Sequence, residues 1–257
     1  MTNPLLQVDS LTVRFDAFCA LDNISFNIDA GTITGLIGPN GAGKSSLFNS
    51  IVGEVPISSG DILFQGSPIT TLPPEKIYAQ GLARTFQIPQ PFAEMTVLEN
   101  LLLSAPNQSG ESFWHALVHP QRVAAEEKLI LDKAHDILTF TTLDRVAHEA
   151  AGKLSGGQQK LLELARVLMG DPAMILLDEP AAGVNPELVK LLIEKIEALN
   201  ARGMTFLIVE HNMDLVMRHC DPIIALAEGK LIFQGNSQQA LTDTQLLDAY
   251  LGVVADD

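Results

Sequence analysis

A glycine-rich loop at residues 38–45 constrains the fold of this chain more than any other feature. The loop reads GPNGAGKS and matches the pattern G-x-x-x-x-G-K-[ST]. It follows the apolar run TGLIG, which predicts a buried strand of a parallel sheet, and helical spacing begins near Lys44. A glycine-rich turn that only caps a helix is the alternative. With strand and helix both in place, we expect a loop that wraps its backbone around phosphate groups.

The residues of this loop have separate expected tasks. Backbone N–H groups from roughly Asn40 to Ser46 would point inward and donate hydrogen bonds to phosphate oxygens. Lys44 can reach the β- and γ-phosphates, and the Ser45 hydroxyl can bind Mg²⁺. The loop therefore predicts a site for a phosphate chain together with a magnesium ion.

Residues 174–179, MILLDE, place two carboxylates at the end of a second predicted strand. Four apolar residues indicate a buried strand, and Asp178 at its carboxyl end would hold Mg²⁺ through water. Glu179 is then placed to polarise an attacking water as a general base. In isolation, two acids after a strand predict only an ordinary exit into a loop. Together with the phosphate loop they predict the catalytic half of the site.

Two further polar side chains are candidates for the same chemistry. His211 ends the run LIVEH (207–211), which predicts another strand. We expect it to contact the γ-phosphate and to help order the hydrolytic water; a core histidine or a helix N-terminal residue is the alternative. Gln87, within ARTFQIP (83–89), could bind Mg²⁺ or water through its amide. The residues alone do not decide whether Gln87 has that role.

The segment LSGGQQKLLELARVL at 154–168 predicts a helix with a glycine-rich start. Ser155 is a good N-cap, and an apolar face begins at Leu161. Gly156 and Gly157 could simply shape the loop that leads into the helix. Alternatively, because glycines have no side chains, they could leave the helix start open, so that its N–H groups and dipole face an anion such as phosphate. The segment by itself leaves both interpretations open.

Composition narrows the class of protein. The 257 residues are 47% hydrophobic, which predicts a globular chain with ample core. The net charge of −15 disfavours nucleic acid and anionic lipid headgroups as partners, because both need a basic surface. Cys19 and Cys220 form no CxxC motif, which favours a reducing, cytosolic compartment. We find no signal-peptide pattern, and no run approaches the ~20 apolar residues of a membrane span.

The first part of the chain reads as strands. We expect an edge strand at 5–15 and two strands within 24–38, joined at Ala30-Gly31. Residues 58–69 predict a strand between two turns.

The remaining elements alternate. Within residues 94–150, the runs at 94–103 and 124–140 show helical periodicity around an irregular segment at 106–120, and the region reads as a helical insert. Strands at 174–178 and 205–210 flank a helical run, and this β-α-β unit predicts that the two strands are parallel. Residues 222–235 predict a hairpin turning at Glu228-Gly229, and a short helix is expected around 242–252.

These motifs together resemble the ATP-binding subunit of ABC transporters over almost the whole chain. GPNGAGKS corresponds to the Walker A loop, MILLDE to Walker B and LSGGQ (154–158) to the ABC signature. Gln87 matches the Q-loop and His211 the switch histidine. Phe15 stands where the family carries the aromatic ring that stacks on adenine. Five motifs in the right order make the resemblance specific, and LSGGQ after a helical insert is decisive.

The resemblance implies an α/β fold: a P-loop NTPase core with a mainly parallel sheet, an N-terminal antiparallel β subdomain and an inserted α-helical subdomain. We expect a single ABC ATPase domain over residues 1–257. Its RecA-like core, with the antiparallel part, would comprise 1–93 and 165–257. Residues from about 94 to 164 would form the helical subdomain that carries the signature.

The resemblance also implies ATP and Mg²⁺ as cofactors of an ATPase. ATP would be bound by Phe15 and by the loop residues Gly38, Pro39, Asn40, Gly41, Ala42, Gly43, Lys44, Ser45 and Ser46. The metal would be held by Ser45, Gln87 and Asp178, and catalysis would use Lys44, Glu179 and His211. The signature would face the ATP of a second chain through Leu154, Ser155, Gly156, Gly157 and Gln158, with Ser155 and Gly157 at the γ-phosphate. Two chains would form a head-to-tail dimer that closes on ATP and opens after hydrolysis.

Two stretches resemble the larger ATPase subunit of branched-chain amino-acid importers: GLARTFQIPQPFAEMTVLENLLL (81–103) and DEPAAGVNP (178–186). Asn185 replaces the Asp that most ABC subunits carry, and Lys160-Leu161 replaces a commoner Arg-Arg. The implied partners are a second ABC ATPase, identical or paralogous, transmembrane permease subunits and, indirectly, a substrate-binding protein. The chain would be peripheral, at the cytoplasmic face of the inner membrane, with 94–128 as the docking face for the permease.

Three other functions compete with this one. Importers of urea and short amides share much of the pattern, and exporter ATPases share the motifs. A soluble ABC protein of DNA repair or ribosomes is disfavoured, because this chain has one Walker A loop and no long heptad run.

His115 and His119 lie four residues apart beside Trp114, but without an obvious third ligand we expect a surface helix and not a zinc site. We expect Cys220, beside His219, to serve packing.

Overall fold

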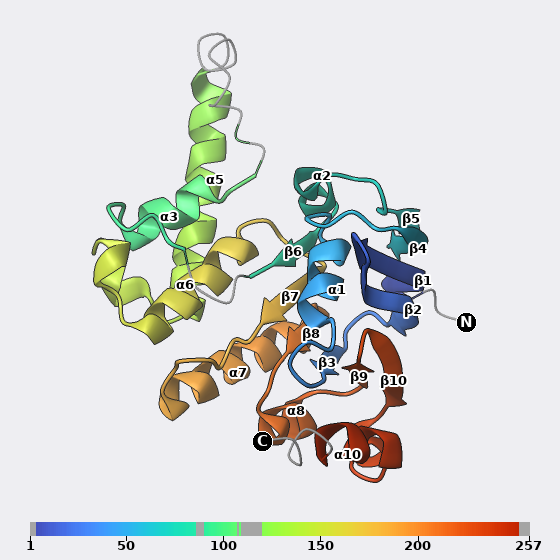
Figure 1. The fold of residues 1–257 in the computed structure, drawn as a ribbon. Coiled ribbons are helices and arrows are strands. Elements are labelled where there is room, and N and C mark those ends of the chain that lie inside the picture. Colours follow the sequence, from blue (N-terminus) through green and yellow to red (C-terminus); the bar gives the residue numbers. More distant parts are fainter. Residues whose placement is uncertain (1–3, 86–89, 107, 109–119, 252–257) are drawn as a thin grey trace. The chain divides into compact units, whose positions relative to one another are not determined.

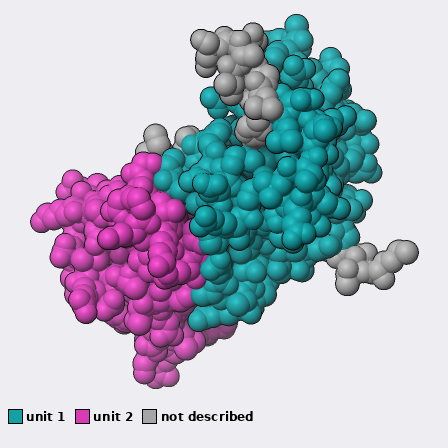
Figure 2. All heavy atoms as spheres, turned by 90° about the horizontal axis from the view of Figure 1, so that it is seen from below, with its two compact units in different colours: residues 1–84, 172–182, 196–257 teal, residues 85–171, 183–195 magenta. Residues whose placement is uncertain are grey.

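The computed structural model describes residues 4–85, 90–106, 108 and 120–251 (Figure 1). The chain divides into two compact units, coloured teal and magenta in Figure 2. The first unit comprises residues 1–84, 172–182 and 196–257, and the second comprises 85–171 and 183–195. The second unit is therefore inserted, in two pieces, into the sequence of the first.

The first unit contains a four-stranded antiparallel sheet with the strand order β2-β1-β4-β5. Its strands are β1 (Leu6–Phe15), β2 (Phe18–Ile28), β4 (Ser59–Phe64) and β5 (Ser67–Pro68). The prediction of an edge strand at 5–15 was wrong, since β1 pairs with β2 on one side and β4 on the other. Alternating apolar residues indicate which face of a strand is buried, but not which strands lie beside it.

A second sheet in this unit has six strands in the order β10-β9-β3-β8-β7-β6. They are β3 (Ile33–Ile37), β6 (Leu82–Arg84), β7 (Met174–Asp178), β8 (Thr205–Val209), β9 (Ile223–Ala227) and β10 (Lys230–Gly235). β10 is antiparallel to β9, and the other pairs are parallel. The predicted parallel neighbours β7 and β8 and the hairpin β9–β10 are confirmed. The two strands predicted within 24–38 belong to different sheets.

The core of the first unit joins both sheets through α1 (Lys44–Ile51), which lies between them (Figure 1). Leu47, Phe48 and Ile51 are fully buried in this cluster. Because the helix is clamped on both sides by apolar packing, the loop that leads into it is held on a rigid support.

Short helices complete the first unit. They are α2 (Pro74–Ala79), α8 (Met213–His219), α9 (Ser237–Ala240) and α10 (Thr244–Leu251). The helix α10 was predicted. The sequence interpretation missed α2, α8 and the three-residue strand β6, because elements this short contain too few turns or alternations to produce a periodic pattern.

The second unit is helical. It contains α3 (Val97–Leu103), α5 (Pro120–Phe140), α6 (Gly156–Leu168) and two short 3-10 turns, η2 (Asp144–Val146) and η3 (Ala151–Lys153). The long helix α7 (Pro186–Asn200) begins here and ends in the first unit. Within the described part of the chain, no helix is long and apolar enough to cross a membrane.

The helix α6 departs from the predicted amphipathic pattern. It begins at Gly156, and residues 160–165 are buried on every side of the helix, Lys160 and Glu163 included. We expected a single apolar face beginning at Leu161, but the buried residues of α6 extend beyond one face of the helix. A helix buried all round has neighbours on every side, and the aliphatic stem of a lysine can contribute to such packing.

Candidate functional site

The phosphate loop follows β3, whose five residues are all buried. Two of its glycines, Gly38 and Gly43, are required by close backbone neighbours. Gly38 has a φ of +152°, and a Cβ there would lie 2.2 Å from the carbonyl oxygen of Leu226. Gly43 has a φ of +101°, and a Cβ would lie 2.7 Å from the carbonyl oxygen of Ala20. Only glycine combines this backbone conformation with such close backbone neighbours.

The helix α1 starts without a side-chain cap. Its N-cap is Gly43 in the left-handed conformation, and no side-chain cap hydrogen bond is formed there among the described residues. The first N–H groups of a helix have no acceptor within the helix, and the helix dipole places partial positive charge at this end. The start of α1 is therefore suited to an anion.

Lys44 is held inside the loop. Its side chain is buried, and its Nζ donates to the carbonyl oxygens of Gly38 at 2.6 Å and Pro39 at 3.0 Å. Burial lowers the pKa of this ammonium, and the nearby charges of Glu179 and Asp178 oppose that shift. A desolvated cation beside a start of helix rich in N–H donors is a strong attractor for phosphate.

Of the two predicted carboxylates, Asp178 ends β7 and Glu179 follows it, and each has a specific partner. Asp178 Oδ2 accepts a hydrogen bond from Arg84 Nη2 at 2.8 Å. Glu179 has a φ of +46°, which is unusual for a residue with a side chain, and its N–H donates to the carbonyl of Val209 at 2.9 Å. The turn directs the two acids to different neighbours.

His211 and Glu179 lie together, as expected of two catalytic groups. His211 Nε2 and Glu179 Oε1 are 2.9 Å apart. An ionised carboxylate can only accept, so Nε2 carries the hydrogen of this bond. Parallel pairing of β7 with β8 brings the ends of the two strands to one edge of the sheet, because Asp178 pairs with Val209.

Other predicted residues occupy different environments. Ser45 is exposed and Ser46 half-buried in the first turn of α1. Phe15 ends β1 directly opposite Phe18, and its ring is 46% exposed. Gln87, His115 and His119 lie outside the described residues. Cys220 is buried, and burial, with the charge of Glu210 as a second cause, raises the pKa of its thiol to about 12.

The segment 154–158 belongs to the second unit and caps the start of α6 with side chains. Ser155 Oγ accepts from the N–H of Gln158 at 3.3 Å, and Gln158 Oε1 accepts from the N–H of Ser155 at 3.0 Å. This capping box confirms Ser155 as the N-cap. The hydroxyl hydrogen of Ser155 can still donate to a ligand, because the hydroxyl oxygen accepts the cap bond.

The two glycines of this segment differ. A Cβ on Gly157 would lie 2.2 Å from Cδ1 of Leu188, so packing within the unit favours glycine there. A Cβ on Gly156 would meet no atom within 4 Å. Nothing in the described structure of this chain therefore requires a glycine at position 156.

The predicted metal ligands suit Mg²⁺ chemically. A hydroxyl, a carboxylate and an amide oxygen are hard ligands, which Mg²⁺ prefers. Among the described residues, no group of three or more His, Cys, Asp and Glu side chains could hold a metal by itself.

Two residues near the carboxylates escaped the sequence interpretation. Arg84 bonds Asn49 Oδ1 at 2.6 Å and Glu54 Oε2 at 2.9 Å, in addition to Asp178. Glu210 is buried and bonds the N–H groups of Ala181 and His211. A charged residue at the end of an apolar strand was the available signal for Glu210. Arg84 ends a strand too short to recognise.

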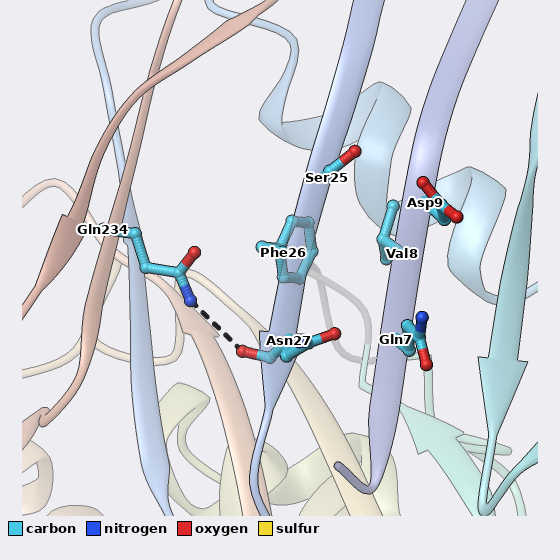
Figure 3. A pocket seen from close by; sticks show the side chains of 7 residues that line it. All are labelled: Gln7, Val8, Asp9, Ser25, Phe26, Asn27 and Gln234. Carbon is cyan, nitrogen blue, oxygen red and sulfur yellow. Dashed lines mark hydrogen bonds between the residues drawn. The ribbon is translucent and has the colours of Figure 1, made fainter. Parts of the chain in front are cut away.

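A pocket elsewhere in the first unit contains none of these residues. It has a volume of about 320 Å³ and lies between β1, β2 and β10, where Gln234 Nε2 donates to the carbonyl of Asn27 at 3.4 Å (Figure 3). Its lining includes three amide side chains, those of Gln7, Asn27 and Gln234. The chemistry predicted from the motifs belongs to the ends of β3, β7 and β8.

Comparisons with known proteins agree with this chemistry. The family model described as "ABC transporter" matches residues 21–182. A protein of Archaeoglobus fulgidus named "Probable branched-chain amino acid transport ATP-binding protein LivG" is 42% identical, covering 96% of this chain and 95% of its own length. "High-affinity branched-chain amino acid transport ATP-binding protein LivG" of Escherichia coli is 36% identical, covering 98% and 99%.

Solved structures agree as well. An ATP-binding cassette of an ABC transporter, solved in its ADP conformation, superposes with a TM-score of 0.83 at 38% identity. The match covers 98% of this chain and 100% of that chain. It therefore extends over the α/β unit and the helical insert alike.

Proposed function

The chain belongs to the ABC transporter family, and on that basis we propose that it is the ATP-hydrolysing subunit of an importer for branched-chain amino acids. The observation that carries the proposal is the hydrogen bond between His211 and Glu179 beside an uncapped phosphate loop. The names of the relatives support branched-chain amino acids over urea or short amides as cargo.

We assign substrate binding to the first unit. The N–H groups at the start of α1 and the Lys44 ammonium would bind the phosphates, and Phe15 would stack on the adenine. Lys44 would exchange carbonyl contacts for phosphate oxygens, a stronger interaction between opposite charges. Ser45, Asp178 and Gln87 would hold Mg²⁺, which neutralises charge that develops on the transferring phosphoryl group.

We assign proton transfer to Glu179. One carboxylate oxygen is bonded to His211 Nε2, which fixes the orientation of the side chain. The other oxygen would accept a proton from the attacking water as the new bond to the γ-phosphorus forms and the bond from that phosphorus to the bridging oxygen breaks, with ADP as the leaving group. His211, whose side chain is 45% exposed, would then contact both the base and the γ-phosphate.

The signature is proposed to act in trans. The Ser155 hydroxyl and the N–H of Gly157 would donate to the γ-phosphate held by a second chain, identical or paralogous. The open space at Gly156 supports close approach of a ligand or partner. Binding of ATP between two chains would couple hydrolysis to opening and closing of the dimer.

The remaining partners are proposed from the family. Permease subunits would dock on residues 94–128 of the helical subdomain, where Leu103 is 51% exposed. A substrate-binding protein would act on the permease from the other side. The chain would then be a peripheral protein on the cytoplasmic face of the membrane.

Glu179→Gln tests the catalytic assignment. We expect ATP to bind normally and turnover to fall by about 10²–10⁴-fold, because the amide cannot accept the proton. Glu197→Gln is the matched control, since Glu197 Oε1 bonds His219 Nδ1 at 2.8 Å in a similar Glu–His pair. Phosphate release and nucleotide titration would be measured for both variants. Wild-type turnover in Glu179→Gln would refute the base assignment.

The transport assignment needs a cellular measurement. In cells that lack this chain, uptake of labelled leucine and of labelled urea would be compared before and after complementation. We expect leucine uptake to return with the wild-type chain and not with Glu179→Gln. Restoration of urea uptake alone would overturn the proposed cargo.

A further inference from the structure

Glu210 is a buried carboxylate at the carboxyl end of β8, immediately before His211. Only 4% of the residue is exposed. Its Oε1 accepts from the N–H of Ala181 at 2.7 Å, and its Oε2 accepts from the N–H of His211 at 3.2 Å. A buried carboxylate is unfavourable unless it is hydrogen-bonded, and here each oxygen has its own backbone donor.

The two donors belong to the two segments that carry the catalytic pair. Ala181 lies two residues after Glu179, in the turn that leaves β7. That turn is also fastened by Glu179, whose N–H donates to Val209 and whose carbonyl accepts from Ala182 at 3.1 Å. The end of β8 therefore holds the segment around Glu179 by two contacts. Val209 uses its main-chain carbonyl, and Glu210 uses its side-chain carboxylate.

We infer that Glu210 is a positioning residue that sets the spacing between Glu179 and His211. This inference rests on the proposed function, because it assigns Glu210 a task in aligning the base of ATP hydrolysis. Hydrogen bonds to a charged group are stronger than neutral ones, so a carboxylate is well suited to bridging two loops. Catalytic groups depend on supporting contacts of this kind to keep their geometry.

Glu210→Gln is the first test. A glutamine has nearly the same shape, but its amide group can accept from one N–H and presents donors to the other. We expect kcat to fall by about 10²-fold, the typical effect of a small misplacement, while KM for ATP stays near the wild-type value. Neither bond of the bridge is made to a residue of the phosphate loop, which explains the expected split between kcat and KM.

The matched control is Asn212→Ala. Asn212 Oδ1 accepts from the N–H of Leu215 at 3.2 Å and caps α8, one residue after His211. Its loss lowers thermal stability in the same segment without removing the bridge. Melting temperatures of both variants would be measured, and we expect Asn212→Ala to keep kcat within about 3-fold of wild type, since helix caps affect stability and not the reacting groups.

A spectroscopic measurement separates positioning from general destabilisation. Nitrogen-15 shifts of the His211 ring, assigned with His211→Gln, report the bond to Glu179. We expect the Nε2 resonance to shift in Glu210→Gln and to remain in place in Asn212→Ala. A loss of kcat with an unchanged His211 resonance would overturn the inference, as would equal kcat in the two variants.

Glu210→Asp keeps the charge but shortens the side chain by one methylene, so it cannot span both donors. We expect it to lose kcat as the Gln variant does, and it decides the question if the Gln variant does not fold. Wild-type kcat in Glu210→Asp would show that charge alone matters and would refute the bridge. Absence of hydrolysis in the wild-type chain with its partners would instead contradict the proposed function.

Discussion

Two helices in this protein begin at glycine-rich segments, and they differ in whether a side chain caps the first turn. The helix α1 begins at an uncapped Gly43, whereas α6 begins with reciprocal hydrogen bonds between Ser155 and Gln158. The loop before α1 needs glycine at positions 38 and 43, because a Cβ at Gly38 or Gly43 would meet a backbone carbonyl. The start of α6 has open space at Gly156.

The difference fits the two kinds of phosphate contact that we propose for the two helix starts. An uncapped start offers several backbone donors at once, which suits a ligand that the chain binds by itself. A capped start has already satisfied part of its first turn and presents an ordered hydroxyl on a rigid helix. Such a site would bind phosphate weakly alone and more strongly when a second chain brings the ligand, which fits the proposed action in trans.

The largest effect should come from removing the cation of the α1 site. Lys44→Ala deletes the buried ammonium between the loop carbonyls, and we expect turnover to fall by about 10²–10³-fold with weaker ATP binding. Nucleotide titration and phosphate release would measure both quantities. Lys230→Ala, which removes an exposed lysine 3.7 Å from Asp22, is the control. Unchanged ATP affinity in Lys44→Ala would contradict the proposal that the start of α1 binds the phosphates of ATP.

The next largest effect should come from Gly43→Ala, which we expect to destabilise the folded chain. The new methyl group would lie near the carbonyl of Ala20 with a left-handed backbone, so we expect a loss of about 2–4 kcal/mol in the free energy of unfolding. Urea unfolding followed by circular dichroism would measure it. A loss below about 0.5 kcal/mol, the range of neutral surface changes, would show that the loop tolerates side chains.

Ser155→Ala should have a smaller effect on stability, about 1 kcal/mol from the lost N-cap. ATP binding by the isolated chain should not change, while ATP-driven dimerisation, measured by light scattering, should weaken. Gln158→Glu serves as the companion variant, because a glutamate keeps the capping box but places negative charge near the partner's phosphate. Dimerisation of Gln158→Glu at wild-type strength would argue against a phosphate at this helix start.

Gly156→Ala should have the smallest effect on the chain itself. A methyl group there meets no atom within 4 Å, and alanine favours helix, so we expect stability to change by less than about 0.5 kcal/mol. Only ATP-driven dimerisation should weaken. Loss of stability as large as in Gly43→Ala would erase the distinction between the two helix starts.

Whether an element could be predicted from the sequence depended on how many residues its pattern contains. The strands at 174–178 and 205–209 were recognisable, since each is a short apolar run with a helix between them. β6 was missed, although it places Arg84 beside Asp178, because three residues show no alternation. Glu210 stands next to the recognised His211, but its bond to Ala181 joins residues 29 positions apart, which no local pattern reports.

The glycine-rich loop, the acidic end of β7, the Ser155 cap and the family could all be read from the order of residues, because each is encoded by neighbouring residues at a fixed spacing. Three features became visible only in the folded chain: β1 is a central strand, residues 160–165 of α6 are buried on every side, and Glu179 lies 2.9 Å from His211. Those features depend on contacts between distant segments. Their free energy comes from burial and pairing across the fold, which the order of residues along the chain does not display.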